Sequence, residues 1–249
     1  MRAAFKRTLQ WIMAALMTGM VAGCADLVYY LQSADGELRV LEARRPISEV
    51  LADPATPPAL KSRLELVLRL RDFASRELKL PDNGSYRNYA DLHRQFIVWN
   101  VFAAPEFSVT PKRWCFLIAG CVAYRGYFSR EGAEKLAVRL RSEGYDVFVG
   151  GVPAFSTLGW FDDPVLNTFI NYPEYELARL LFHELAHQRV YAKNDSQFNE
   201  SFAVTVETVG VERWIAHRND PAMKHGVRDY PTATRRCPRP YARVSQQTA

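Results

Sequence analysis

Three residues of the segment FHELAHQ have the types and the spacing needed for metal-dependent hydrolysis: His183, Glu184 and His187 stand in H-E-x-x-H order. Positions i and i+4 lie on one face of an α-helix, so both imidazoles can bind one zinc ion. Glu184 projects one residue further round, where its carboxylate can reach a water at the metal and act as a general base. Zinc lowers the pKa of such a water to about 7, which gives a nucleophile against an amide bond.

A third metal ligand must come from elsewhere, because a catalytic zinc site uses three protein ligands and an open position. Glu200 follows His187 after a short spacer, and a turn at Lys193 to Ser196 would bring its helix back across the first. Glu207 lies two turns further along the same face. The spacing alone leaves both glutamates open as the third ligand.

The sequence around the two histidines argues against an ordinary surface helix, on which a bare H-E-x-x-H also occurs. The flanking residues are apolar: Leu177, Leu180, Leu181, Leu185, Ala186 and Val190. The face that carries His183 and His187 is therefore expected to lie against a core, where unpaired histidines would be costly. This context favours metal binding.

The sequence predicts that the elements around these residues form an α+β fold, with a small mixed or antiparallel sheet packed on helices. Apolar periodicity and capping residues predict the helices, and β-branched and aromatic runs predict the strands. Gly150 and Gly151 predict a bend. The expected helices are 27–42 (loosened near Gly36), 60–80, 131–142 capped by Ser129, 173–191 and 197–217, and the expected strands are 95–102, 114–118, 121–124 and 146–149.

The segment from Phe155 to Phe161 is predicted to be the last strand before the histidine helix. An edge strand beside a metal can pair with an extended peptide. The predicted substrate contacts are therefore Ser156, Thr157, Leu158 and Gly159. Asp162 and Asp163 follow at once and could bind a substrate α-ammonium group, although a turn before Pro164 explains them equally well.

The N-terminus predicts a signal peptide over residues 1–23, with a basic start and a short apolar core from Trp11 to Val21. The residues Val21-Ala22-Gly23-Cys24 resemble the lipobox of bacterial lipoproteins, which implies lipidation of Cys24. Ala25 follows, so the resemblance favours the outer membrane facing the periplasm. Stable anchoring needs several acyl chains. An ordinary signal peptide with an incidental Cys24 is the alternative.

Composition predicts one globular domain, expected over residues 24–220. The net charge is +5 and 48% of residues are hydrophobic. Most of the excess positive charge lies between Arg213 and Arg243, so a nucleic-acid surface in the body is not expected. Residues 221–249 predict a basic disordered tail. Cys115 and Cys121 are expected either to form a disulfide or to stay as two reduced thiols.

Taken together, these motifs resemble a family of proteobacterial lipoproteins described as zinc aminopeptidases. The resemblance rests on Cys24, on the segments 120–128 and 150–164, and on HELAHQ and FNESFA, and it ends near Trp214. Asn199 to Ala203 is also similar to the N-E-x-F-A of alanyl-aminopeptidase-type zinc enzymes. The resemblance implies a zincin-like, gluzincin-type peptidase with Zn²⁺ on His183, His187 and Glu200, and with Glu184 as the base.

The chain departs from that family in two places. The spacer between His187 and Glu200 is short, so the loop between the helices must be tight. The composition also changes near Pro221, which gives the hypothesis of a frameshifted or truncated terminus; a helical continuation in another reading frame would support it. Three tyrosines are candidates for stabilising an oxyanion: Tyr124, Tyr127 and Tyr172. An envelope endopeptidase and a non-catalytic zinc-binding scaffold are the alternative functions.

Overall fold

The structure is a computed structural model that describes residues 27–116 and 120–219. It divides into two units, Met1–Glu42 and Ala43–Ala249. In the first unit, residues 27–42 form a helix that runs through Gly36 without the expected break. The predicted signal peptide, Cys24 and basic tail lie outside the described residues. None of the helices described is both long and apolar enough to cross a membrane.

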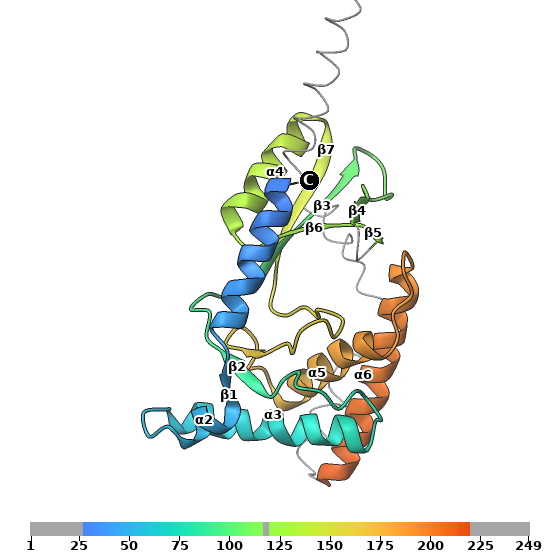
Figure 1. Cartoon of the computed structure of the whole chain (residues 1–249). Helices are drawn as coiled ribbons and strands as arrows, with labels where there is room; N and C mark the ends of the chain where they lie inside the picture. Colours follow the sequence, from blue (N-terminus) through green and yellow to red (C-terminus); the bar gives the residue numbers. More distant parts are fainter. Residues whose placement is uncertain (1–26, 117–119, 220–249) are drawn as a thin grey trace, which may run out of the picture. The chain divides into compact units, whose positions relative to one another are not determined.

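The largest sheet of the second unit is antiparallel, in the order β6-β3-β7 (Figure 1). Its strands are β3 (Val98–Pro105), β6 (Arg125–Tyr127) and β7 (Tyr145–Val152). Helix α4 (Arg130–Ser142) packs on it through a buried apolar cluster that includes Val101, Ala103, Leu136 and Leu140. The predicted cap is confirmed, because the Ser129 hydroxyl accepts from the amide of Gly132.

Two expectations for this sheet were wrong. The first strand begins at Val98 and not at residue 95. Gly150 and Gly151 do not bend the chain but continue β7, opposite Asn100 and Trp99. A side chain at Gly151 would collide with the ring of Phe96. The glycines therefore permit a close approach of a neighbouring ring inside a strand, which sequence alone does not distinguish from a bend.

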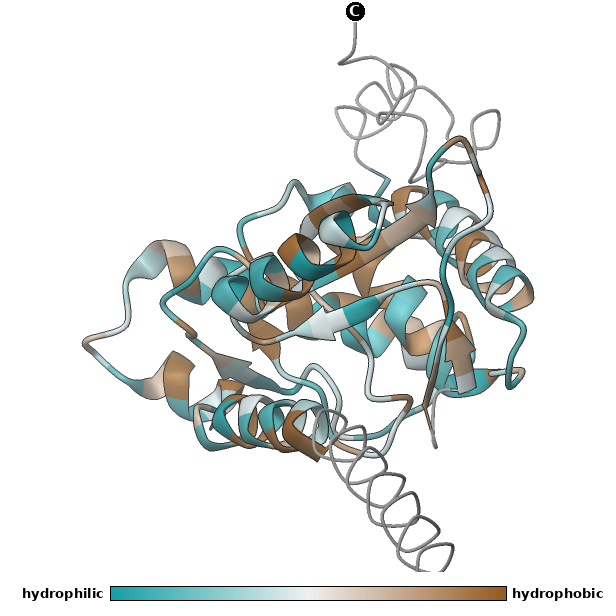
Figure 2. Cartoon of the chain, turned by 90° about the horizontal axis from the view of Figure 1, so that it is seen from above, coloured by the Kyte–Doolittle hydropathy of each residue, from teal (hydrophilic) through white to brown (hydrophobic). Residues whose placement is uncertain are grey.

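The helical layer of this unit consists of α3 (Pro58–Arg76), α5 (Glu174–Arg189) and α6 (Ser196–Arg218). Figure 2 shows that the helices of the chain carry both hydrophilic and hydrophobic residues. Phe73 of α3 packs against Phe182 of α5 and Trp214 of α6, with ring centroids 6.0 and 5.1 Å away. Helices α5 and α6 approach closely at Gly210, where a Cβ would lie 2.7 Å from Cδ2 of Phe182.

Short elements complete the fold. Strand β2 (Asn88–Ala90) pairs antiparallel with β1 (Arg45–Pro46) and parallel with β8 (Val165–Leu166). The short helix α2 (Ile47–Ala52) follows β1 and was not predicted. The hairpin of β4 (Trp114–Phe116) and β5 (Gly120–Val122) places Cys115 opposite Cys121. The structure joins these cysteines in a disulfide, which settles the alternative that the sequence left open.

The expected α+β class is confirmed by this mixture of helices and small, mostly antiparallel sheets. The predicted edge strand is wrong, because no strand forms between Phe155 and Phe161. A turn forms there instead: the amide of Trp160 donates to the carbonyl of Thr157 at 3.1 Å. Leu158 and Gly159 both have positive φ angles, 57° and 82°, which an extended strand does not accept.

Candidate metal centre

The position of α5 is fixed by its apolar residues, six of which are buried: Leu177, Ala178, Leu181, Phe182, Leu185 and Ala186. The helix begins directly after Pro173, close to its predicted start. His183 and Glu184 are partly exposed, while His187 is buried. Burial of the apolar stripe therefore orients the H-E-x-x-H residues toward the start of α6, which follows after a short loop.

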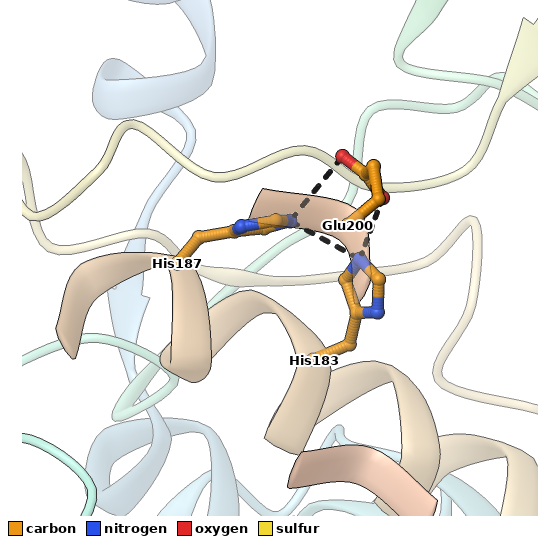
Figure 3. A group of neighbouring side chains, drawn as sticks. All are labelled: His183, His187 and Glu200. Carbon is orange, nitrogen blue, oxygen red and sulfur yellow. Dashed lines mark hydrogen bonds and ion pairs between the residues drawn. The ribbon is translucent and has the colours of Figure 1, made fainter. Parts of the chain in front are cut away.

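The three predicted ligands converge on one point (Figure 3). His183 Nε2 and His187 Nε2 are 3.1 Å apart, with ring planes at 85°. The two carboxylate oxygens of Glu200 lie 3.4 Å from His183 Nε2 and 3.7 Å from His187 Nε2. All the potential ligand atoms lie within 4.8 Å of one another. The structure thus brings together the residues that the sequence placed on separate helices.

These separations fit a tetrahedral ion. Zinc bonds of about 2.0–2.1 Å at tetrahedral angles place neighbouring ligand atoms about 3.3 Å apart. The observed values of 3.1, 3.4 and 3.7 Å lie on either side of that spacing. Neutral imidazole nitrogens and a carboxylate oxygen are also donors that zinc accepts. The donor set and its geometry therefore suit a metal ion.

The electrostatics of the site favour a cation between these side chains. Burial would lower the pKa of His183, but its hydrogen bonds with Glu200 and Glu207 outweigh that effect and raise the pKa to about 10. Burial and the nearby charge of His183 lower the pKa of His187. The hydrogen bond from His183 lowers the pKa of Glu200. The cluster therefore holds one positive charge tightly, which a bound metal ion would replace.

Glu207, the rival third ligand, lies on the other side of the His183 ring. Its Oε2 is 2.8 Å from His183 Nδ1, and its Oε1 accepts from Arg179 at 3.4 Å. A carboxylate on Nδ1 holds the proton there and leaves Nε2 free to bind a metal. His187 Nδ1 has no such partner among the described residues. The geometry thus gives Glu200 and Glu207 different tasks.

Glu184 has the electrostatic environment of a general base. Burial raises its pKa to about 7. The positive charge of His183 opposes this rise, while the negative charges of Glu200 and Asp163 add to it. A carboxylate that titrates near neutral pH can both accept and release a proton there. The role of Glu184 as the general base stays a prediction.

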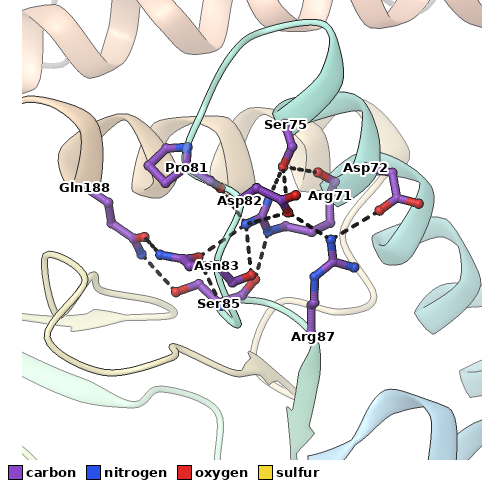
Figure 4. A network of polar contacts seen from close by, with 9 residues as sticks. All are labelled: Arg71, Asp72, Ser75, Pro81, Asp82, Asn83, Ser85, Arg87 and Gln188. Carbon is purple, nitrogen blue, oxygen red and sulfur yellow. Dashed lines mark hydrogen bonds and ion pairs between the residues drawn. The ribbon is translucent and has the colours of Figure 1, made fainter.

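The residue after His187 connects α5 to two loops. The side-chain amide of Gln188 donates to Ser85 Oγ at 3.2 Å and to Asp163 Oδ2 at 3.3 Å, and its oxygen accepts from Asn83 at 2.9 Å. Figure 4 shows how Arg71 completes the network from α3. Arg71 is fully buried and donates to the carbonyls of Ser85, Pro81 and Asn83. The loops beside the metal centre are therefore fixed to both helices.

The predicted substrate segment borders this network. Asp163 is 5% exposed and its Oδ2 accepts from the amide of Thr157 at 3.1 Å. Burial raises its pKa to about 6. Asp163 thus holds the turn that contains Ser156, Thr157, Leu158 and Gly159. Gly159 lies beside the side chain of Gln188, so the turn adjoins the H-E-x-x-H helix.

The acidic pair after this turn has a structural setting. Asp163 is committed to the network, and the carboxylate of Asp162 packs against Gly84. The carbonyl of Asp162 accepts from Arg44 at 3.0 Å. The role of Asp162 in binding a substrate α-ammonium group stays a prediction.

Tyr86 is a residue of this region that sequence reasoning missed. Its side chain is 1% exposed, its hydroxyl has no hydrogen-bond partner among the described residues, and its φ is 61°. Burial raises the pKa of Tyr86 well above its ordinary value, and the charges of Glu184 and Asp163 add to the rise. Its amide donates to the carbonyl of Asp163. Nothing in the local sequence signals this position.

The tyrosines that were predicted as oxyanion candidates occupy other places. Tyr127 belongs to β6 of the main sheet. Tyr124 is 41% exposed and its ring packs against Phe102 at 5.7 Å. Tyr172 precedes α5, about three turns before His183. Their role in catalysis stays a prediction.

Comparison with known proteins places the chain in a family. Neither the curated proteins nor the solved structures gave a match. The model of a family described as Putative aminopeptidase matches residues 28–247. The match therefore extends beyond Trp214, where the sequence-level resemblance was expected to end. Because it covers well over half of the chain and all of the residues above, the protein belongs to this aminopeptidase family.

Proposed function

We propose that this protein is a zinc-dependent metallopeptidase with a zincin-like fold. His183, His187 and Glu200 would hold Zn²⁺, and Glu184 would act as the general base. The observation that carries the proposal is the convergence of two imidazole Nε2 atoms and a carboxylate at 3.1 to 3.7 Å. The aminopeptidase family supports peptide bonds as the substrate class.

The chain's own residues account for the proton transfers of hydrolysis. Zinc, when bound, supplies a Lewis acid and lowers the pKa of a water at the site to about 7. The carboxylate of Glu184 takes a proton from the water while the oxygen of the water attacks the carbonyl carbon of the peptide bond. The same carboxylate then delivers this proton to the amine nitrogen that leaves. Burial keeps the pKa of Glu184 near the range that both transfers need.

Glu207 acts as a positioning residue in this proposal. Its Oε2 holds the proton of His183 Nδ1, so that Nε2 presents its lone pair to the metal. Arg179 in turn contacts Glu207 and Glu176, with its Nε 2.9 Å from Glu176 Oε2. The carboxylate of Glu207 is therefore held from the side opposite His183.

The preference for an exopeptidase rests on the description of the family. Ser156, Thr157, Leu158 and Gly159 would line the substrate, and Asp162 would meet its free amino group. The turn they form is held beside α5 by Asp163 and Gln188. Peptides with free and acetylated N-termini separate the two modes: an aminopeptidase cleaves only the free form, whereas equal rates would identify an endopeptidase.

We also propose that the protein is anchored in the bacterial cell envelope by lipid on Cys24 and faces the periplasm from the outer membrane. The disulfide between Cys115 and Cys121 supports this location, because disulfides persist in oxidising compartments. Cys24→Ala tests the anchor by fractionation of cells. The protein should move from the membrane fraction to the soluble one, and retention in the membrane would reject lipidation at Cys24.

Glu184→Gln tests the catalytic role. The substitution keeps the size of the side chain and leaves the three ligands intact, so zinc content should equal that of the wild type. Cleavage should fall by at least 100-fold, since the base is lost. Normal zinc with unchanged cleavage would exclude Glu184 as the base. If wild-type protein binds zinc but cleaves no peptide, the function as a non-catalytic zinc-binding scaffold would be favoured.

A further inference from the structure

The disulfide hairpin contacts the loop that links the two metal-binding helices. The amide of Cys121 donates to Oδ1 of Asn194 at 3.0 Å. The approach is so close that a side chain at Gly120, whose φ is 73°, would collide with the same oxygen. Asn194 belongs to the loop over residues 190–195, between the end of α5 and the start of α6.

The same loop is fixed from the other side by α6 itself. Asn199 is 2% exposed, and its side chain bonds both backbone groups of Ala192: it accepts from the amide at 2.7 Å and donates to the carbonyl at 2.9 Å. Asp195 caps α6 by accepting from the amide of Phe198 at 3.0 Å. The loop is therefore held by α6 on one side and by the hairpin on the other.

Glu200 depends on this arrangement for its position. Its side chain is 63% exposed, so little packing surrounds it. It directly follows Asn199 in the first turns of α6, so a shift of the loop moves its carboxylate relative to the two imidazoles. His183 and His187, by contrast, share one helix and keep their mutual geometry. Glu200 is thus the ligand most sensitive to the loop.

We propose that the Cys115–Cys121 hairpin, through Asn194, is a positioning device for the third metal ligand. The disulfide fixes Cys121, Cys121 fixes Asn194, and Asn194 sets where α6 begins relative to α5. The affinity of the site for zinc then depends on a contact made outside the metal ligands. This inference rests on the proposed function, because it assigns the binding of zinc to His183, His187 and Glu200.

Asn194→Gly isolates the contact. Glycine tolerates the φ of 67° at this position but provides no acceptor for the amide of Cys121. Zinc affinity, measured by competition with a chromogenic chelator, should weaken by up to about 5-fold, because one ordinary hydrogen bond is the most that this contact can contribute. Asn194→Asp keeps an acceptor and should bind zinc as the wild type does. Asn194→Gly with wild-type affinity would overturn the proposal.

Asn219→Gly is the matched control. Asn219 also has a positive φ, 48°, and lies at the opposite end of the same helix. The substitution is the same, but Asn219 lies at the end of α6 away from Glu200 and the hairpin, so zinc affinity should not change. An equal loss in both variants would show that α6 stability, and not the hairpin contact, sets the affinity, and would reject the proposal.

The disulfide supplies an independent arm. Cys115→Ala with Cys121→Ala removes the bridge without leaving thiols that could bind zinc. This double substitution should weaken zinc binding to a similar extent. Adding Asn194→Gly should weaken zinc binding only slightly further, because both changes remove the same interaction between the hairpin and the loop. Fully additive losses would contradict a shared path. If thermal melting shows that the double cysteine variant is unfolded, the Asn194 variants still test whether the hairpin contact affects zinc affinity.

The outcome also separates this inference from the proposed function. Wild-type protein that binds no zinc rejects the metal site itself. Wild-type protein that binds zinc with an affinity unaffected by Asn194→Gly rejects only the role of the hairpin.

Discussion

At the residue scale, two glutamates on α6 face different nitrogens of the same histidine. Glu200 approaches Nε2 of His183 at 3.4 Å, while Glu207 approaches Nδ1 at 2.8 Å. Glu200 is 63% exposed and Glu207 is 8% exposed at the side chain. Exposure suits a ligand at the mouth of a site, and burial suits a residue that orients a ring. The two carboxylates therefore contact different nitrogens of one candidate ligand, Glu200 at Nε2 and Glu207 at Nδ1.

Substitution of each glutamate should give different losses of zinc. Glu200→Gln removes a charged ligand, and purified protein should retain little zinc. Glu207→Gln leaves the ligands in place but loosens His183, so that affinity should fall by about 10- to 100-fold. Zinc quantification after dialysis against a graded chelator distinguishes the two. Full zinc content in Glu200→Gln would assign the third ligand elsewhere.

Asp163 gives a stability that depends on pH. Burial raises its pKa from 3.8 to about 6, so the folded protein binds this proton more tightly than the unfolded chain does. The contribution is therefore fully present below about pH 4 and is lost as the pH rises through about 6. Asp163→Asn abolishes this titration. The unfolding free energy of wild type relative to the variant should fall by roughly 2 to 3 kcal/mol between about pH 4 and pH 7.

Denaturant unfolding of the two proteins, both stripped of metal by a chelator, measures this difference. Titration of the groups that do not interact with Asp163 is common to both proteins and cancels, whereas the effect of its charge on the pKa of Glu184 stays in the difference. A difference that stays constant across the range would show that the carboxyl of Asp163 is not perturbed by burial.

At the element scale, α3 and α5 are joined through the loop that follows α3. Arg71 of α3 donates hydrogen bonds to the loop carbonyls of Ser85 and Pro81. Gln188 of α5 accepts a hydrogen bond from the side chain of Asn83 and donates one to Ser85 Oγ. The loop has little regular secondary structure, so these side-chain hydrogen bonds determine its conformation. Its position in turn determines where Asp163 and the adjacent turn lie. The buried guanidinium therefore holds the loop from which Tyr86 donates to the carbonyl of Asp163.

Arg71→Met should destabilise the protein by about 3 kcal/mol, because buried carbonyls lose their donor while the apolar volume is kept. Arg69→Met, on the exposed side of the same helix, should change stability by less than about 0.5 kcal/mol. Chemical denaturation of the three proteins checks the contrast. Equal effects of the two substitutions would contradict the role of the network.

Sequence pattern sufficed for some elements of this site and not for others. The i, i+4 spacing of His183 and His187 determines their shared face from helical geometry alone. The choice between Glu200 and Glu207 could not follow from spacing, because both lie on that side of α6, and the family resemblance made it. Arg71 lies on the packed face of α3, but its partners lie in an aperiodic loop that a helical pattern does not reveal. The turn around Leu158 has β-prone residues, but local side-chain hydrogen bonds of Ser156, Thr157 and Asp163 fold it into a turn.

At the scale of the whole second unit, the metal centre lies in the helical layer, and the sheet-bearing part reaches it at two points. One is the turn after β7, held by Asp163 and Gln188. The other is the disulfide hairpin, which contacts Asn194. Helix α5 thus carries two of the three candidate ligands, while segments distant in the sequence contact the residues around them.

The most direct test of this account is anomalous diffraction at the zinc edge from crystals of the zinc-loaded protein. We expect one peak within bonding distance of His183 Nε2, His187 Nε2 and a carboxylate oxygen of Glu200, with Glu207 still on His183 Nδ1. Glu184 should face the open side of the peak. A peak elsewhere, or one coordinated by Glu207 in place of Glu200, would contradict the proposed centre.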